Sequence, residues 1–216
     1  MDRVWLLTWT TYGTWLPGED RGFVSNVDLG DGKGRRLNEV GSNPAAKIRG
    51  LQILSKNKMK GPPVYLTVDQ AEVLFAQFRE TAVFRNWSLL AVAIMANHVH
   101  LLVGVSGDPD PHRLLRDFKS YGSRCLTQFA GRPASGTWWT EGGSTRKKGS
   151  DEAIINATEY VSNQVYPLLI WRAGTASGGR KPPVSIVERL PDGTRFPVNP
   201  KDTRDPNPNR PCGGCV

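Results

Sequence analysis

Apolar residues in the first half of the chain change from alternating to helical spacing and back, which predicts the order strand, helix, strand, strand. Residues 4–11 are rich in β-branched and aromatic side chains and predict an opening strand. A capping box at Thr67, followed by apolar residues at three- and four-residue intervals, predicts a helix to about Val83. Residues 87–94 and 98–105 predict two antiparallel neighbouring strands, because their link is too short for a crossover.

The second half of the chain predicts two more helices, with a strand and a loop between them. After a break rich in Pro and Gly, a helix is expected over about 111–130. Residues 136–143 indicate a short strand with a glycine turn, and 146–148 a basic loop. Ser150 then caps a last helix, which Pro167 ends.

The 111–130 helix has an apolar side and a basic side. On an ideal helix, one narrow sector contains Leu114, Phe118, Tyr121, Cys125 and Phe129. We therefore expect Tyr121 to be a core residue. The opposite side carries Arg113, Arg116, Lys119 and Arg124. Cations placed there can follow phosphate groups.

Three helices among four or five short strands predict an α+β fold, with an antiparallel sheet and helices packed against one face. We expect this domain to occupy residues 1–170. Residues 25–63 contain Gly, Asn, Pro and scattered charge, and predict a long surface insertion with a short helix near 45–56. Residues 171–216 are rich in Pro, Gly and basic residues and predict an irregular tail.

The composition is that of a soluble folded domain. The chain has 216 residues, of which 38% are hydrophobic, enough for one core. It has no apolar run long enough to span a bilayer and no signal-peptide pattern at its start, so we expect a cytoplasmic protein. Cys212 and Cys215 have metal or redox spacing, but one such pair is weak evidence.

The charge favours a polyanionic partner. The formal net charge is +8, and the excess of basic residues is concentrated between Pro111 and Ser150. The basic residues of that stretch are Arg113, Arg116, Lys119, Arg124, Arg132, Arg146, Lys147 and Lys148. A solvated helix face followed by a basic loop would give the same pattern.

The candidate chemistry lies in two places. His98 and His100 project from one face of their strand and can share a divalent cation; alternatively, they are solvated or hydrogen-bonded side chains of a half-exposed sheet. In the last helix, Ile154, Val161 and Val165 form the apolar stripe. Tyr160 and Gln164, four residues apart at its edge, can reach the histidines; alternatively, they are an interfacial tyrosine and a solvated glutamine.

Taken in chain order, the His-x-His strand, the basic helix and the last helix resemble the single-tyrosine HUH transposases. This group includes small insertion-sequence transposases and REP-associated tyrosine transposases. Met95-Ala96-Asn97-His98-Val99-His100-Leu101-Leu102-Val103 is similar to the family's HUH strand, and Tyr160 and Gln164 match its Tyr-x-x-x-Gln helix. The stretches 12–18 and 138–143 also look like sequences found in members of this group. The resemblance covers roughly residues 3–168, while the 25–63 insertion and the tail depart from the compact family pattern.

The resemblance implies a ferredoxin-like sheet and a strand-transfer enzyme for DNA. Tyr160 would be the nucleophile that forms a 5′-phosphotyrosine and leaves a free 3′-hydroxyl, so that a second 3′-hydroxyl can rejoin the strand without ATP. His98, His100 and Gln164 would bind the metal. A donor set of imidazoles and an amide, without a thiolate, favours Mg²⁺ or Mn²⁺ over structural zinc.

Single-stranded or hairpin DNA is the expected partner, with Trp residues available for base stacking. The residues expected to contact DNA are Arg113, Arg116, Lys119, Arg124, Arg146, Lys147 and Lys148. No membrane partner is expected, and a homodimer is left open. Two other functions also fit the sequence: a non-catalytic, domesticated binder of hairpin DNA, and a metal-dependent nuclease that uses water, with Tyr160 structural.

Overall fold

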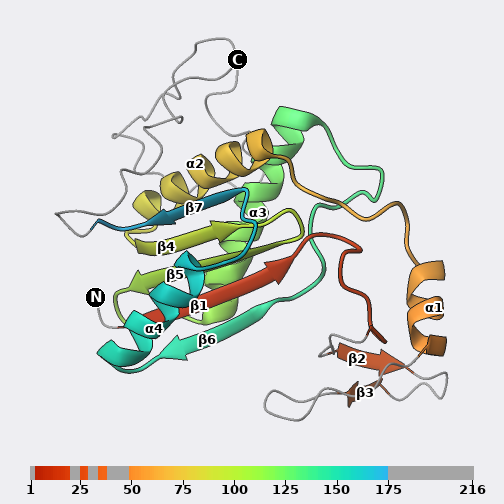
Figure 1. Ribbon diagram of the computed structural model, residues 1–216, viewed down its shortest axis with the longest axis horizontal. Coiled ribbons are helices and arrows are strands. Elements are labelled where there is room, and N and C mark those ends of the chain that lie inside the picture. The colour runs from red at the N-terminus through yellow and green to blue at the C-terminus, as the bar shows by residue number, and fades with distance from the viewer. Residues whose placement is uncertain (1–2, 20–24, 29–33, 38–48, 175–216) are drawn as a thin grey trace.

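The computed structural model describes residues 3–19, 25–28, 34–37 and 49–174 (Figure 1). In chain order its elements are β1 (Arg3–Thr10), β2 (Ser25–Asp28), β3 (Gly34–Leu37), α1 (Arg49–Asn57), α2 (Val68–Phe84), β4 (Ser88–Ile94), β5 (His98–Val105), α3 (Pro111–Ala130), β6 (Ser144–Lys148), α4 (Asp151–Ser162) and β7 (Leu169–Arg172). Among these residues, five strands form one antiparallel sheet in the order β6-β1-β5-β4-β7. The expected α+β fold with an antiparallel sheet is confirmed.

Local signals in the sequence start the helices where they were expected. The Thr67 hydroxyl accepts a hydrogen bond from the Gln70 amide, and the Gln70 side chain accepts one from the Thr67 amide, which completes the capping box of α2. Asp110 caps α3 and Ser150 caps α4 through their side-chain oxygens. These caps satisfy backbone donors that would otherwise lack a partner.

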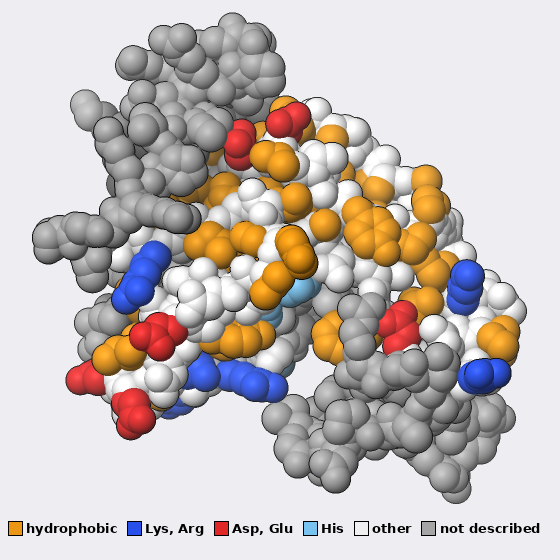
Figure 2. All heavy atoms as spheres, viewed as in Figure 1, with side chains coloured by type: hydrophobic (Ala, Val, Ile, Leu, Met, Phe, Trp, Pro, Cys, Tyr) orange, Lys and Arg blue, Asp and Glu red, His pale blue; other side chains and the backbone are white. Residues whose placement is uncertain are grey.

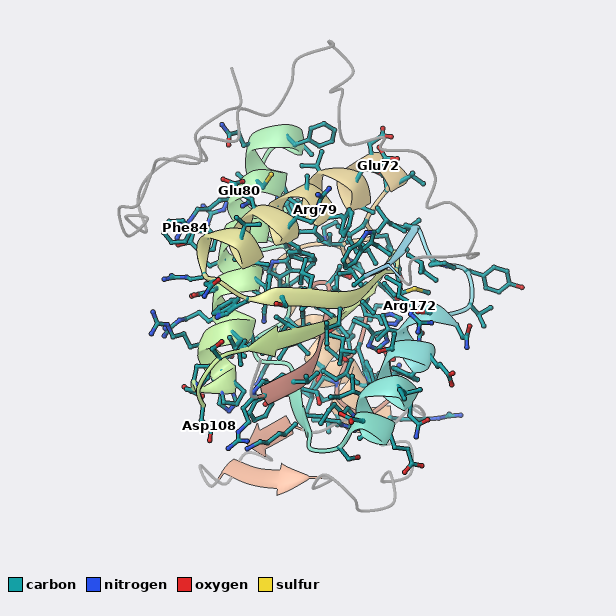
Figure 3. The ribbon with its side chains drawn as sticks, turned by 90° about the vertical axis from the view of Figure 1, so that its left-hand side faces the viewer. Glu72, Arg79, Glu80, Phe84, Asp108 and Arg172 are labelled. Carbon is teal, nitrogen blue, oxygen red and sulfur yellow. The ribbon has the colours of Figure 1, made fainter. Side chains whose placement is uncertain are left out.

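The sheet has helices on both of its faces, so the expectation of helices on one face alone needs correction (Figures 1 and 3). The elements β1-α2-β4-β5-α3-β6 follow the ferredoxin-like order, and β7 extends the sheet beyond β4. Leu101 and its neighbours pack with α2 and α3 in the larger core. Leu102 packs on the other face with Ala157 and Val161 of α4.

The basic loop predicted at 146–148 is a strand. β6 pairs antiparallel with β1, with Leu6 opposite Arg146 and Thr8 opposite Ser144. Within 136–143, where a strand was expected, the structure has an isolated bridge between Thr11 and Trp139. An edge strand pairs on one side only and tolerates charged residues, so β6 lacks the apolar alternation by which a strand is predicted.

Two predictions about helical faces were wrong. The last helix ends at Ser162, before Gln164, and Val165 is 68% exposed instead of belonging to an apolar stripe. Tyr121 is half-buried, with the Arg124 guanidinium 5.1 Å from the centre of its ring, so it is no core tyrosine. A helical phase predicts which residues share a side, but it does not predict how far the neighbouring elements cover them.

The described residues include part of the 25–63 insertion and the first residues of the expected tail. A β2–β3 pair and α1 lie within the 25–63 insertion, and Figure 1 shows them beside the main sheet. β7 extends the domain past residue 170, because it pairs with β4. Most of the expected tail, including Cys212 and Cys215, lies outside the described residues. Within the described part of the chain, no helix is long and apolar enough to cross a membrane.

Candidate active site

The register of the sheet brings the two histidines to the face that α4 covers. His100 lies opposite Thr8 of β1 and His98 lies opposite Thr10, so these four side chains share one side of the sheet. The imidazole centroids are 4.8 Å apart and the rings are nearly perpendicular, at 82°. His100 is buried, whereas His98 is half-buried at the edge of the site.

Both imidazoles have a hydrogen bond at Nδ1. His100 Nδ1 lies 2.8 Å from the Thr8 hydroxyl, and His98 Nδ1 lies 2.7 Å from Oδ1 of Asn97. An amide oxygen only accepts, so His98 Nδ1 carries the proton and its Nε2 carries the lone pair. An imidazole held in this way can offer Nε2 to a metal.

Burial keeps His100 in the form that binds metals. Desolvation lowers its pKa from 6.5 to about 4, and the nearby His98 contributes to the shift in the same direction. The ring is therefore neutral near pH 7. A neutral imidazole can donate its lone pair, whereas an imidazolium cannot.

α4 places Tyr160 against the histidine pair. Ala157 and Val161 are buried against the sheet and fix the rotation of the helix, which leaves Tyr160 51% exposed. The Tyr160 hydroxyl lies 3.5 Å from Nε2 of His100, and the two ring centroids are 5.1 Å apart. The structure thus brings a solvent-accessible phenol next to a buried imidazole.

An open pocket of about 520 Å³ lies beside Tyr160 and His98. Its lining consists of Met95, His98, Asn156, Glu159, Tyr160, Asn163, Gln164 and Val165. Gln164 donates a side-chain hydrogen bond to the Tyr160 carbonyl at 2.9 Å, which leaves its oxygen as an acceptor. Three polar residues of the wall were missed from the sequence: Asn156, Glu159 and Asn163. Asn156 could have been found, because it stands four residues before Tyr160 on the same helix.

The donor set fits a divalent cation that keeps open coordination positions. No group of three or more His, Cys, Asp or Glu side chains in the described part of the chain could hold a metal. Two imidazoles and the Gln164 amide oxygen would therefore have to be completed by oxygens of a ligand or of water. Mg²⁺ and Mn²⁺ accept such mixed sets.

The three consecutive basic residues of β6 point to different faces. Arg146 and Lys148 lie opposite Leu6 and Val4, which pack with α4, so both share the face of Tyr160. Lys147 lies on the other face, 5.8 Å from the Trp5 ring centre and 3.7 Å from Asp108. Figure 2 shows histidine atoms near the middle of the Tyr160 face, with Lys and Arg side chains beside them over β6.

The opposite edge of this face also carries a basic residue. Arg172 of β7 is exposed and lies opposite Ala91, which packs with α4. Figure 3 shows Arg172 on the side of α4, away from Glu72, Arg79 and Glu80 of α2. Sequence reasoning missed Arg172, because a strand after Pro167 was not expected.

α3 packs on the other face of the sheet, so its basic residues are separated from Tyr160 by the sheet. Arg113 and Arg116 are exposed, whereas Arg124 lies over the Tyr121 ring and donates to Ser120. Lys119 donates to the carbonyls of Thr140 and Gly142, at 2.7 and 2.6 Å. Lys119 therefore links α3 to the loop before β6.

Trp residues in general were expected to be available for base stacking, but Trp138 and Trp139 are buried. Each is 5% exposed. The indole of Trp138 donates to the Thr127 hydroxyl and that of Trp139 donates to the Lys119 carbonyl. These two side chains belong to the core, whereas Trp15 is 40% exposed.

Comparison with known families identifies the domain that carries this site. Residues 63–164 match the family model described as "Transposase IS200 like". This stretch of the chain is similar to IS200-like transposases. The resemblance to single-tyrosine transposases is thus confirmed, and the matched region contains both histidines, Tyr160 and Gln164. It leaves out β1 and β7 of the same sheet.

Among the solved structures that align with this chain, one has low sequence identity to it. It is described as "Structure of the REP associates tyrosine transposase bound to a REP hairpin", and it aligns with a TM-score of 0.41 and 12% sequence identity. The alignment covers 74% of this chain and 65% of that one, so this chain spans about two thirds of that protein's length. No curated protein matches the sequence.

Proposed function

We propose that this transposase domain cleaves and rejoins single-stranded or hairpin DNA through a 5′-phosphotyrosine on Tyr160. The observation that carries the proposal is the position of the Tyr160 hydroxyl, 3.5 Å from Nε2 of His100 on an open face of the sheet. A nucleophile must be reachable by a DNA strand and must lie beside groups that stabilise charge on the phosphate. Tyr160 meets both requirements.

His98, His100 and Gln164 are the proposed ligands of Mg²⁺ or Mn²⁺. The histidines would bind through Nε2 and Gln164 through its amide oxygen, because Nδ1 of each ring and the Gln164 amino group have hydrogen bonds within the protein. When bound, the cation would neutralise charge on the phosphoryl oxygens.

The proposed reaction exchanges one phosphoester for another. The Tyr160 oxygen attacks phosphorus, and the bond from phosphorus to the 3′-oxygen breaks. The phenol loses its proton and the departing 3′-oxygen gains one, so protons balance and no oxidant or reductant is needed. A second 3′-hydroxyl can then attack the phosphotyrosine, which rejoins the strand and restores Tyr160. This reversal consumes no ATP, because the energy of the phosphoester bond is retained.

Arg146 and Lys148 are the proposed phosphate contacts nearest to the site, because β6 places them on the face of Tyr160. Arg172 is a further candidate at the opposite edge. Arg113, Arg116 and Arg124 would contact only DNA that passes round the β6 edge towards α3. Lys119 and Lys147 have partners within the protein. We therefore expect the latter two to contribute less.

The test is formation of a covalent adduct on a labelled DNA hairpin in the presence of Mn²⁺. Wild-type protein should give a denaturant-resistant adduct, and Tyr160→Phe should give none. The matched control is Tyr121→Phe, which removes a hydroxyl on the other face of the sheet and should leave the adduct unchanged. An adduct in Tyr160→Phe would refute the proposal. Cleavage that persists without an adduct would favour a water-using nuclease, and a gel shift alone would favour a non-catalytic binder.

A further inference from the structure

Three threonine hydroxyls, one in β1 and two just after it, make hydrogen bonds at the start of the histidine strand. Thr8 contacts Nδ1 of His100 at 2.8 Å. Thr11 and Thr14 are 0% and 7% exposed, and their hydroxyls donate to the Asn97 carbonyl at 3.2 and 3.1 Å. Asn97 in turn holds Nδ1 of His98 at 2.7 Å. Each imidazole is thus connected to the segment 8–14.

The hydroxyls of Thr11 and Thr14 both lie within hydrogen-bond distance of the Asn97 carbonyl, and the Thr14 hydroxyl also lies 3.0 Å from the Thr11 carbonyl. The Thr11 amide also donates to the Asn97 carbonyl, at 2.9 Å, and the two hydroxyl oxygens lie 3.0 Å apart. Burying a hydroxyl is unfavourable unless it is hydrogen-bonded, so these contacts fix where Asn97 lies. Asn97 is the last residue of the link between β4 and β5 and directly precedes His98, the first residue of the histidine strand. Fixing its backbone therefore fixes the start of that strand.

We propose that Thr8 and Asn97 are positioning residues of the histidine pair, and that Thr11 and Thr14 hold Asn97 in place. Thr8 orients His100 and Asn97 orients His98, so that both rings present Nε2 to the space beside Tyr160. This inference rests on the proposed function in taking the histidines as metal ligands. It assigns part of the site to residues 8–14, which lie outside the region that matches the transposase family model, 63–164.

The decisive variant is Thr8→Val, which keeps the shape and β-branching of the side chain and removes the hydroxyl. Loss of such a supporting contact weakens metal binding about 10- to 100-fold. We expect this loss in the Mn²⁺ dissociation constant of the full-length protein, measured without DNA by electron paramagnetic resonance. Thr8→Ser should restore wild-type affinity. Thr10→Val is the matched control, because Thr10 lies on the same strand and face but contacts Thr140.

A second pair of variants tests the other ring. Asn97→Leu removes the acceptor for His98 Nδ1 and should weaken Mn²⁺ binding to a similar extent. Asn97→Asp keeps an acceptor oxygen and should bind Mn²⁺ at least as well as the wild type. Circular dichroism melting curves would identify a variant that fails to fold, and only variants that melt cooperatively enter the comparison.

A measurement without metal distinguishes a change in the orientation of the histidine rings from general damage to the fold. In wild-type protein, ¹⁵N NMR of the histidine rings should show both protons on Nδ1, and Thr8→Val should change the His100 signals alone. Unchanged NMR signals and unchanged Mn²⁺ affinity in Thr8→Val, with normal wild-type binding, would overturn the positioning role and leave the proposed function intact. A wild-type protein that binds no Mn²⁺ would instead contradict the proposed function, and the positioning role with it.

Discussion

The hydroxyl of Tyr160 lies 3.5 Å from Nε2 of His100, although 60 positions separate the two residues in the sequence. The contact forms because His100 projects from the central strand β5 towards α4, whose buried residues Ala157 and Val161 turn Tyr160 to the same place. His100 is 5% exposed and Tyr160 is 51% exposed. The arrangement combines a rigid imidazole with a phenol that a DNA strand can reach.

Removal of divalent cations should separate binding from chemistry. The proposed metal ligands lie beside Tyr160, whereas the basic residues of β6 do not depend on a metal. Treatment with EDTA should therefore abolish the covalent adduct and leave most of the affinity for a DNA hairpin. Added Mn²⁺ should restore the adduct in wild-type protein and fail to do so in His98→Ala. Full adduct formation in EDTA would exclude a metal-dependent step.

The salt dependence of DNA binding should report which basic residues contact phosphates. Arg146 and Lys148 lie on the face of Tyr160, whereas Lys147 lies on the opposite face beside Trp5 and Asp108. Each phosphate contact to a single strand contributes about −0.7 to the slope of log K against log salt. The double variant Arg146→Gln, Lys148→Gln should thus reduce the slope by about 1.4.

Lys147→Gln is the matched control for this experiment, because it removes a neighbouring charge from the same strand. Its slope should stay close to that of the wild type. If Lys147→Gln reduced the slope as much as Arg146→Gln or Lys148→Gln does alone, the two faces of β6 would not differ in DNA binding.

Much of the sheet and the pair His98–His100 could be predicted from sequence spacing, because buried strands and capped helices leave strong local patterns. β6 and β7 could not. Both are edge strands, and β6 reads Ser-Thr-Arg-Lys-Lys, without the apolar residues that a central strand requires. Their pairing depends on β1 and β4, which are distant in the sequence. Arg146 was predicted as a DNA contact from its charge, but the side of the sheet on which Arg146 and Arg172 lie became visible only with the register.

The face of the sheet on which each helix packs could not be predicted from the sequence either. The apolar stripe of α4 is narrow, and only three of its residues are buried: Ala157, Thr158 and Val161. Such a stripe fits either face of a sheet. The supporting contacts of Thr8 and Asn97 depend on side-chain distances, which residue spacing cannot give. Tyr160 and Gln164 were predictable because they are close in the sequence and resemble a family motif.

The ion pair between Arg85 and Asp117 should stabilise the contact of α2 with α3. The two charged atoms are 3.1 Å apart, and the Asp117 side chain is 11% exposed. Asp117→Ala should lower the free energy of unfolding by about 3 kcal/mol, because it leaves a partly buried guanidinium without its carboxylate. Asp108→Ala removes a carboxylate that is 60% exposed and should cost at most about 1 kcal/mol. Equal losses in urea unfolding would show that burial of the Arg85–Asp117 pair does not matter.

Lys119 should make stability depend on pH in the alkaline range. Burial lowers its pKa from 10.5 to about 8, against a smaller opposing effect of Glu141. Between these two values the unfolded chain keeps the lysine proton while the folded protein releases it. The unfolded state then binds more protons, so this group makes the free energy of unfolding rise with pH from about 8 to 10.5, and it contributes no slope below that window.

Lys119→Met should remove this contribution. The variant also loses the hydrogen bonds to Thr140 and Gly142, which lowers its stability at every pH. The test is therefore the difference between wild type and variant, obtained from urea unfolding at several pH values from 7 to 10. That difference should stay constant up to about pH 8 and then grow, whereas Lys58→Met, at an exposed position after α1, should give a constant difference throughout. Parallel curves for wild type and Lys119→Met would show that Lys119 keeps its proton in the folded protein. In that case its two carbonyl partners would offset its burial.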